Sequence, residues 1–258
     1  MNRAELKRYV GTTGHTLGHV EKDYLQHIVL AAYSRNLAGH LLFKGGTALQ
    51  KRGVVARFSE DLDFTMMGEV EAKRLERSAV QALEAYNYPA RTDSEKEDVR
   101  AMSFRLRIEG PLFNDDPISL TSLRIEVSKR ERVILPASRD EIAPPYGDVM
   151  PYVLSSMDLR EVLAEKVRTL ATRSKARDLY DVAQLTGQGI IVGMDLVDKK
   201  MEWGEEAFDR GMILERSRHL RGVWEKELSS LMEYVPPFGE ALEALEGLLE
   251  DLRPTGDE

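Results

Sequence analysis

A glycine-centred motif in the first fifty residues is the feature of this sequence that most constrains the fold. The apolar run 41–43 stops at Gly45 and Gly46 and continues into Thr47 and an Ala-Leu-Gln segment, a pattern that predicts a buried strand, a tight turn and a helix start. Glycines let the backbone approach a ligand, the unpaired N–H groups of a helix start favour an anion, and Thr47 adds a capping hydroxyl. The motif therefore predicts a phosphate-holding turn, although a plain structural turn would have the same sequence.

Two aspartates follow this motif. The segment 61–64, Asp-Leu-Asp-Phe, alternates acidic and apolar residues, so in a strand Asp61 and Asp63 would lie on one face, about 6.6 Å apart. Carboxylates so placed can share a hard divalent cation, with Mg²⁺ expected and Mn²⁺ as the alternative. An edge strand with a solvated acidic face would show the same alternation. Taken together, the turn and the acids predict metal-assisted phosphoryl or nucleotidyl transfer.

These two motifs resemble a known family. Residues 44–49, Lys-Gly-Gly-Thr-Ala-Leu, followed by residues 57–64, Arg-Phe-Ser-Glu-Asp-Leu-Asp-Phe, are similar to the nucleotidyltransferase toxins of the AbiEii family, which include the mycobacterial MenT toxins. That family lies in the polymerase-β-like nucleotidyltransferase superfamily. The resemblance implies metal binding by Asp61 and Asp63, and it implies nucleotide binding by Gly45, Gly46, Thr47, Arg57, Ser59 and Lys166.

A third carboxylate is expected on a later strand. Residues 102–108 and 123–128 alternate apolar with polar side chains and are joined by a linker containing Gly, Asn, Asp and Pro, which predicts two strands that could pair antiparallel. Members of the superfamily carry a further metal ligand beside the Asp-x-Asp strand, and the resemblance implies Glu126 for it. The family has Asp where this chain has Glu, so the metal role stays open beside the alternative of an acid on a solvated sheet face.

A second block, residues 161–181, resembles the later motifs of the same toxins. The resemblance implies Lys166 as a phosphate-binding lysine and either Asp178 or Asp181 as an essential catalytic acid. Lys166 lies near the apolar stripe of a predicted helix, where a lysine either meets an anion or extends its charge to the surface. Asp178 and Asp181 would share one helix face, and a structural salt bridge with a nearby arginine is expected for one of them.

The densest proline cluster, from Pro136 to Pro151, marks the expected domain boundary. We expect an α/β (α+β) nucleotidyltransferase core over residues 1–150, with a mixed β-sheet flanked by helices. Residues 151–258 are expected to form an α-helical domain that contributes Lys166 and Asp178 or Asp181 to the site.

Three further segments have specific expectations. Amphipathic helices are predicted over 22–36 and 69–86, whereas the charged stretch 91–98 is predicted to be a connection. His15 and His19 are spaced as helical metal ligands would be, but Gly18 weakens a helix and no acid completes a zinc-protease pattern. An exposed N-terminal segment is therefore favoured there.

Composition restricts the partners. The 258 residues include 36 Lys plus Arg and 44 Asp plus Glu, so the net charge of −8 limits any RNA contact to a local patch. Basic runs at 166–177 and 216–221 could form such a patch or be solvated helix faces. The absence of cysteine excludes disulfides and thiolate chemistry, and no signal peptide or long apolar run is present, so a cytoplasmic protein with no membrane partner is expected.

Together with the family resemblance, these observations predict a Mg²⁺-dependent nucleotidyltransferase that transfers a nucleoside monophosphate from a nucleoside triphosphate and releases pyrophosphate. The resemblance implies a toxin of a toxin–antitoxin system, with RNA as acceptor, specifically the 3′ end of tRNA, a block of translation, and an antitoxin protein as partner. The alternatives are a nucleotidyltransferase acting on a small molecule or a protein side chain, and a non-catalytic nucleotide-binding partner protein.

Overall fold

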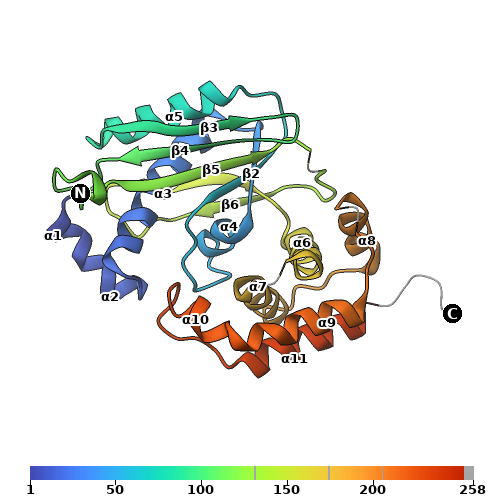
Figure 1. Cartoon of the computed structure of the whole chain (residues 1–258). Coiled ribbons are helices and arrows are strands. Elements are labelled where there is room, and N and C mark those ends of the chain that lie inside the picture. Colours follow the sequence, from blue (N-terminus) through green and yellow to red (C-terminus); the bar gives the residue numbers. More distant parts are fainter. Residues whose placement is uncertain (131, 174, 205, 253–258) are drawn as a thin grey trace. The chain divides into compact units, whose positions relative to one another are not determined.

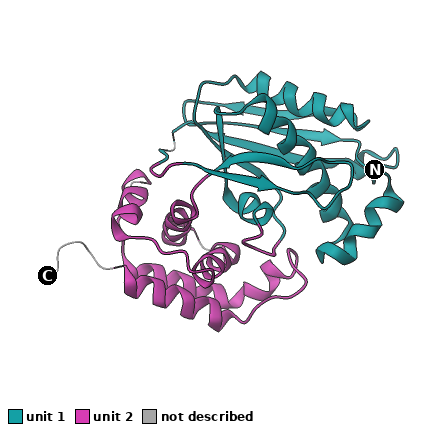
Figure 2. Cartoon of the chain, turned by 180° about the vertical axis from the view of Figure 1, so that it is seen from behind, with its two compact units in different colours: residues 1–52, 58–133, 137–156 teal, residues 53–57, 134–136, 157–258 magenta. Residues whose placement is uncertain are grey.

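The structure, a computed structural model, describes residues 1–130, 132–173, 175–204 and 206–252. The chain forms two compact units (Figure 2). Unit 1 comprises residues 1–52, 58–133 and 137–156, and unit 2 comprises residues 53–57, 134–136 and 157–258. The last residues of the expected helical domain, 253–258, lie outside the described residues, and the division at residue 150 stays a prediction.

Unit 1 is built on a mixed seven-stranded sheet (Figure 1). The strands are β1 (Leu41–Lys44), β2 (Leu62–Met66), β3 (Ala90–Glu97), β4 (Ala101–Ile108), β5 (Thr121–Ser128), β6 (Ser138–Ile142) and β7 (Tyr152–Ser156). Their order in the sheet is β3-β4-β5-β2-β1-β7-β6. The pairs β2/β5 and β1/β7 are parallel, and the other neighbours are antiparallel. The predicted mixed α/β core is confirmed.

The predicted alternation of the strands places one face of the sheet in the core. Phe64, Phe104 and Ile125 are buried on that face, and helices α3 (Leu17–Asn36) and α5 (Ala72–Ala85) cover it (Figure 1). Because successive side chains of a strand point to opposite faces, the polar residues between these apolar ones all lie on the other face. Asp63 and Glu126 are among them, so these two candidate metal ligands lie on the same face of the sheet.

The N-terminal segment differs in part from its prediction. It forms α1 (Arg3–Leu6), a 3-10 turn (Lys7–Tyr9) and α2 (Val10–Thr13), and α3 then begins after Thr16, whose hydroxyl accepts the His19 N–H at 3.2 Å. His15 is buried, and the ring of His19 stacks on Phe58 with centroids 4.2 Å apart. Most residues of this segment are exposed, as expected, but His15 is buried and His19 is half-buried, because both rings pack against Phe58.

The charged stretch 91–98 is the clearest error of secondary structure. Residues 90–97 form β3, which pairs with β4 along its length and has an irregular register between Thr92 and Ser94. Charged residues are disfavoured inside sheets, but β3 is an edge strand and most of its side chains are exposed. Pairing with β4, which no local pattern encodes, decides the conformation.

Unit 2 contains the predicted helices. These are α6 (Leu159–Thr172), α7 (Ala176–Gly187), α8 (Met194–Trp203), α9 (Arg210–His219), α10 (Trp224–Leu228) and α11 (Phe238–Asp251). Asp158 caps α6 by accepting the Arg160 N–H at 2.9 Å. The short segment 134–136 joins this unit because fully buried Glu161 accepts the N–H groups of Ile134 and Leu135 at 3.0 and 2.8 Å. Among the described residues, no helix has both the length and the apolar character needed to cross a membrane.

A buried polar cluster fastens α4 (Gly45–Lys51) to α3 within unit 1. Asp23 on α3 accepts from Lys51 at 2.5 Å, from Gln50 at 3.0 Å and from the Tyr146 hydroxyl at 2.8 Å. The side chains of Asp23 and Lys51 are only 7% and 2% exposed. Burial would raise the pKa of Asp23, but the neighbouring Lys51 charge outweighs it and lowers that pKa to about 2.

This cluster makes a stability prediction. Asp23→Asn leaves the buried Lys51 charge without a counter-charge, and we expect it to lower the free energy of unfolding by about 3 to 5 kcal/mol. The double variant Asp23→Asn/Lys51→Met removes both charges and should recover a large part of that loss. Urea unfolding of the three proteins measures this, and a double variant no more stable than the single one would contradict the ion-pair explanation.

Candidate active site

Gly45, at the end of β1, has a backbone that other residues rarely adopt. Its φ is +74°, in the left-handed region, and a Cβ on Gly45 would lie 2.5 Å from Asp63 Oδ2 and 3.1 Å from Asp63 Cβ. Both the turn and the close approach therefore require glycine. The phosphate-holding role of this turn stays a prediction, and within the protein the close neighbour of Gly45 is the carboxylate of Asp63.

Asp63 lies in a row of polar residues across four strands. In the register of the sheet Asp63 is opposite Lys44 of β1 and Glu126 of β5, and Glu126 is opposite Ser103 of β4. Since neighbouring strands lie about 4.8 Å apart, the carboxyl groups of Asp63 and Glu126 are adjacent on one face. Glu126 also accepts a hydrogen bond from Arg124 at 2.6 Å.

Asp61 is placed differently from the sequence expectation. Strand β2 begins at Leu62, so Asp61 precedes the strand, and its carbonyl accepts the hydroxyl of buried Thr47. No group of three or more acidic or histidine side chains forms a metal site within the described ranges. The neighbouring oxygen ligands of Asp63 and Glu126 nevertheless suit Mg²⁺, which takes one or two carboxylates and completes its shell with water and substrate phosphate.

Helix α4 holds the segment that carries Ser59 and Asp61. The Thr47 hydroxyl binds the Asp61 carbonyl, and Gln50 Oε1 accepts the Ser59 N–H at 3.0 Å. The hydroxyl of Thr47, expected from the resemblance to meet nucleotide, is thus used on the backbone of the acidic segment. The same helix that follows the glycine turn therefore sets the position of Asp61.

Gln26 is a positioning residue that the sequence analysis missed. It is fully buried on α3, and its Nε2 donates to the carbonyls of both Ser59 and Glu60 at 2.9 Å. The available signal was a glutamine between the apolar residues Leu25 and Ile28 of a predicted helix. A buried amide must find partners, and here it finds the backbone that leads to Asp61.

In unit 2 a buried ionic network joins four of the predicted site residues and Arg173. Arg57 binds Asp181 with two parallel hydrogen bonds, of 2.6 Å from Nε and 2.7 Å from Nη2. Lys166 lies 2.6 Å from Asp181 and 2.9 Å from Asp178, which in turn pairs with Arg173 at 2.9 Å. Both aspartates are fully buried, so the salt bridge expected for one of them exists for both. Ser174, next in the chain, lies outside the described residues.

The network shifts the pKa values of its members toward the charged forms. Burial would raise the pKa of Asp178, but the charges of Lys166 and Arg173 hold it well below its ordinary value, and Arg57 and Lys166 do the same for Asp181. Burial would lower the pKa of Lys166, yet the two carboxylates raise it. All members are therefore ionised at neutral pH, with one more positive charge than negative.

The second basic run, 216–221, is engaged within unit 2. Arg216 donates to the Ala171 carbonyl at 2.5 Å, Arg218 pairs with Glu246 at 2.9 Å, and the guanidinium of Arg221 lies 5.1 Å from the centre of the Phe238 ring. These contacts join α9 and the turn after it to α6 and α11. In the first run, Lys175 and Arg177 are exposed.

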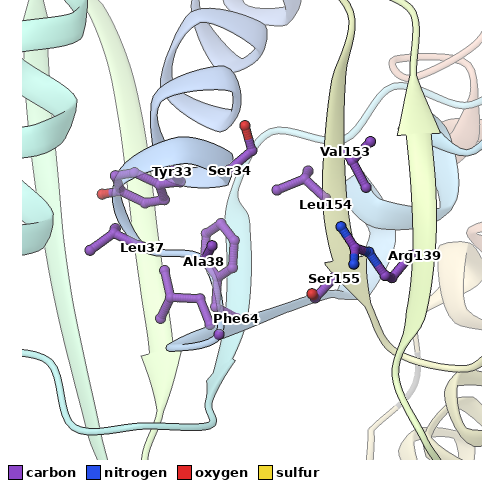
Figure 3. Close-up of a pocket in the computed structure, with 11 residues that line it drawn as sticks. Tyr33, Ser34, Leu37, Ala38, Phe64, Arg139, Val153, Leu154 and Ser155 are labelled. Carbon is purple, nitrogen blue, oxygen red and sulfur yellow. The ribbon is translucent and has the colours of Figure 1, made fainter.

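A small pocket in unit 1 lies away from the candidate residues. Tyr33, Ser34, Leu37 and Ala38 line one side, and Val153, Leu154, Ser155 and Arg139 line the other (Figure 3). It also contacts Gly39 and Leu41, at the opposite end of β1 from Gly45. None of the predicted site residues lines it.

The geometry at Gly45 predicts that the addition of a single methyl group at this position causes a loss of function. Gly45→Ala should cost about 1 to 2 kcal/mol for the left-handed backbone, and its Cβ would displace the Asp63 carboxylate. Gly18→Ala is the matched control, because Gly18 lies in α3 with nothing within 4 Å of a new Cβ. Urea unfolding and nucleotidyl transfer are the measurements, and a Gly45→Ala protein as stable and active as wild type would contradict this assignment.

The ionic network predicts a pH dependence of stability. An unfolded aspartate titrates near pH 3.9, and the folded pKa of Asp178 is lower, so its stabilisation is complete above about pH 4 and is lost as the pH falls through the folded pKa. Asp178→Asn should cost roughly 3 kcal/mol at pH 7 and should make the unfolding free energy fall less steeply below pH 4. Exposed Asp195→Asn is the control. Equal acid sensitivity in wild type and Asp178→Asn would contradict the role of this carboxylate.

Comparison with known proteins identifies the family. Over residues 28–245 the chain matches the family model described as nucleotidyl transferase AbiEii toxin, Type IV TA system. Among solved structures it is similar to the nucleotidyltransferase toxin MenT4 from Mycobacterium tuberculosis H37Rv, with a TM-score of 0.68, 20% identity, and coverage of 98% of this chain and 91% of that one.

A second solved structure, JHP933 from Helicobacter pylori, is similar with a TM-score of 0.58, 18% identity and 92% coverage of both chains. At these identities the two likenesses show a shared fold. None of the curated proteins matches the chain. The family match spans most of the sequence, and the chain belongs to the AbiEii family of nucleotidyltransferase toxins.

Proposed function

We propose that this toxin transfers a nucleoside monophosphate from a nucleoside triphosphate to an RNA acceptor, specifically the 3′ end of tRNA, and thereby blocks translation. One observation carries the proposal: in a chain of this family, the Asp63 carboxylate lies against Gly45 and beside Glu126. An acidic pair next to a glycine turn suits a substrate that brings phosphates and a divalent cation together.

In the proposed reaction, an acceptor hydroxyl oxygen bonds to the α-phosphorus, the bond from that phosphorus to the bridging oxygen of the β-phosphate breaks, and pyrophosphate leaves with the electron pair. The hydroxyl proton passes to solvent. Asp61 and Asp63, with Glu126 beside them, would hold Mg²⁺ or Mn²⁺. When bound, the cation would supply charge neutralisation on the triphosphate and a lower pKa of the acceptor hydroxyl.

The chain's own residues would orient the triphosphate. The backbone N–H groups at Gly45, Gly46 and Thr47, and the Ser59 hydroxyl, are the proposed donors to phosphate oxygens. The bonds from Thr47, Gln50 and Gln26 support this, because they hold the segment with Ser59 and Asp61 in one conformation.

The ionic network would serve the leaving pyrophosphate. Arg57 and Lys166 keep their charges because Asp181 and Asp178 raise the pKa of both side chains against the effect of burial, and cations held in place favour an approaching anion. Only Phe58, Ser59 and Glu60 separate Arg57 from Asp61 in the sequence. We therefore include Arg57 and Lys166 as phosphate-binding residues, and Asp178 and Asp181 as the acids that keep these cations charged and oriented.

Membership of a toxin–antitoxin family supports two further parts of the proposal. A cognate antitoxin protein would bind this chain and silence it, and the reaction would take place in the cytoplasm, where nucleoside triphosphates and tRNA occur together. A small molecule or a protein side chain as acceptor, or nucleotide binding without catalysis, are the competing outcomes.

The test is incubation of the purified protein with each α-labelled nucleoside triphosphate, Mg²⁺ and total tRNA. Label should enter the tRNA band with wild type. In Asp63→Asn it should fall by at least about 100-fold, because a lost metal-binding carboxylate removes several kcal/mol of transition-state stabilisation. Asp195→Asn makes the same chemical change at an exposed position and should retain activity.

Omission of Mg²⁺, with Mn²⁺ as replacement, tests the cation. Label on the protein itself or on a small molecule would move the acceptor assignment, and no transfer with any nucleotide would refute the enzymatic proposal.

A further inference from the structure

The open face of strands β3, β4 and β5 is unusually basic for a chain with a net charge of −8. This is the face that carries Asp63 and Glu126, opposite the core face that α5 covers (Figure 1). The register places these basic side chains on it: Arg91, Lys96, Arg105, Arg107 and Arg124. We call this set the basic sheet face.

Two of these arginines oppose each other directly. Arg105 of β4 is the register partner of Arg124 of β5, so their Cβ atoms lie about 5 Å apart on the same face. Like charges in this position repel and destabilise a sheet. Arg124 is relieved by Glu126 at 2.6 Å, whereas Arg105 is exposed and has no carboxylate within ion-pair distance among the described residues.

Acidic residues offset only part of the positive charge of the basic sheet face. Asp93 pairs with Arg107 at 3.3 Å, with both side chains more than one-third exposed. Glu126 is the neighbour of Asp63 in the register. If Glu126 joins Asp63 in holding a cation, as in the proposed function, the charge of Glu126 is shared between that cation and Arg124. Arg124, like Arg105, then lacks a full counter-charge and would bind an anion.

The chemistry of arginine and the position of Arg105 indicate which kind of anion the basic sheet face binds. Arginine binds phosphate through two parallel N–H groups, and several arginines on a flat strand surface suit a repeating phosphate backbone better than a single small anion. Arg105 is two residues along and two strands across from Asp63, roughly 12 Å from it between Cα atoms. A strand of nucleic acid with its end at Asp63 would therefore pass over Arg105 and Arg124 within a few nucleotides.

We propose that the basic sheet face binds the sugar-phosphate backbone of a single-stranded RNA acceptor and leads its end to Asp63. This inference rests on the proposed function for the identity of the acceptor, but it assigns the binding surface to β4 and β5 of unit 1. The basic runs of the helical region are not required for it, which fits the engagement of Arg216, Arg218 and Arg221 within unit 2.

The test measures binding of a fluorescein-labelled single-stranded RNA ending in CCA by fluorescence anisotropy at several salt concentrations. Arg105→Glu should weaken binding roughly tenfold and reduce the salt dependence by about one unit, and Arg105→Gln should fall between this variant and wild type. A matched control is Arg77→Glu, since Arg77 is exposed on α5 at the opposite face and undergoes the same charge change. Thermal unfolding should be unaffected by Arg77→Glu, whose side chain is exposed, and should be unchanged or shifted to higher temperature by the two Arg105 variants, which relieve the repulsion of Arg124.

Titration with a fluorescent nucleoside triphosphate analogue and label transfer to tRNA separate this inference from the proposed function. Arg105→Glu should bind the nucleotide as wild type does and show a raised KM for tRNA with little change in kcat. If wild type labels tRNA and Arg105→Glu binds RNA as tightly as Arg77→Glu, the inference is overturned while the proposed function stands, and the face is left to an acidic protein partner. If wild type neither binds nor labels RNA, both are refuted.

Discussion

The absence of a side chain at Gly45 allows the end of β1, the start of α4 and the carboxylate of Asp63 to occupy the same small volume. A Cβ there would be 2.5 Å from Asp63 Oδ2, so this contact fixes how closely the turn and β2 approach each other. Other contacts of unit 1 support that approach. Thr47, Gln50 and Gln26 bind the backbone of the segment before β2. Asp23 on α3 binds Lys51 and so fixes the position of α4. A polar site at the centre of a mixed sheet is stable here because buried side chains satisfy its backbone.

The buried ionic groups of unit 2 have a different role. Arg57, Lys166, Asp178 and Asp181 satisfy one another almost completely, and such a network is costly to desolvate and offers little net stability over an apolar core. We expect its value to lie in the fixed orientation of the two cations. Removal of either aspartate would leave a buried cation without its partner. Both aspartates therefore stabilise unit 2, in addition to their role in the proposed chemistry.

Local patterns in the sequence were sufficient to predict much of the secondary structure, but they did not predict the edge strand β3 or the buried glutamines. The alternation around Leu62 and Phe64 predicted strand β2 with Asp63 on its polar face, although Asp61 precedes the strand. The apolar periodicity around Lys166 predicted α6, because burial of one face follows directly from that spacing. Strand β3 was missed because its conformation comes from pairing with β4. Gln26 and Gln50 were missed because the neighbouring residues do not identify the distant backbone groups to which the two amides bind.

Strand β3 also affects how the protein meets other molecules of its kind. It is one edge of the sheet, and an edge with unpaired N–H and C=O groups can recruit a strand from another chain. Here the edge carries Asp93, Glu95, Lys96 and Glu97, and its pairing is interrupted between Thr92 and Ser94, so an incoming strand would meet charge and an irregular backbone. The charged residues of this strand led the sequence analysis to predict a connection, and the same residues protect the strand from edge-to-edge aggregation.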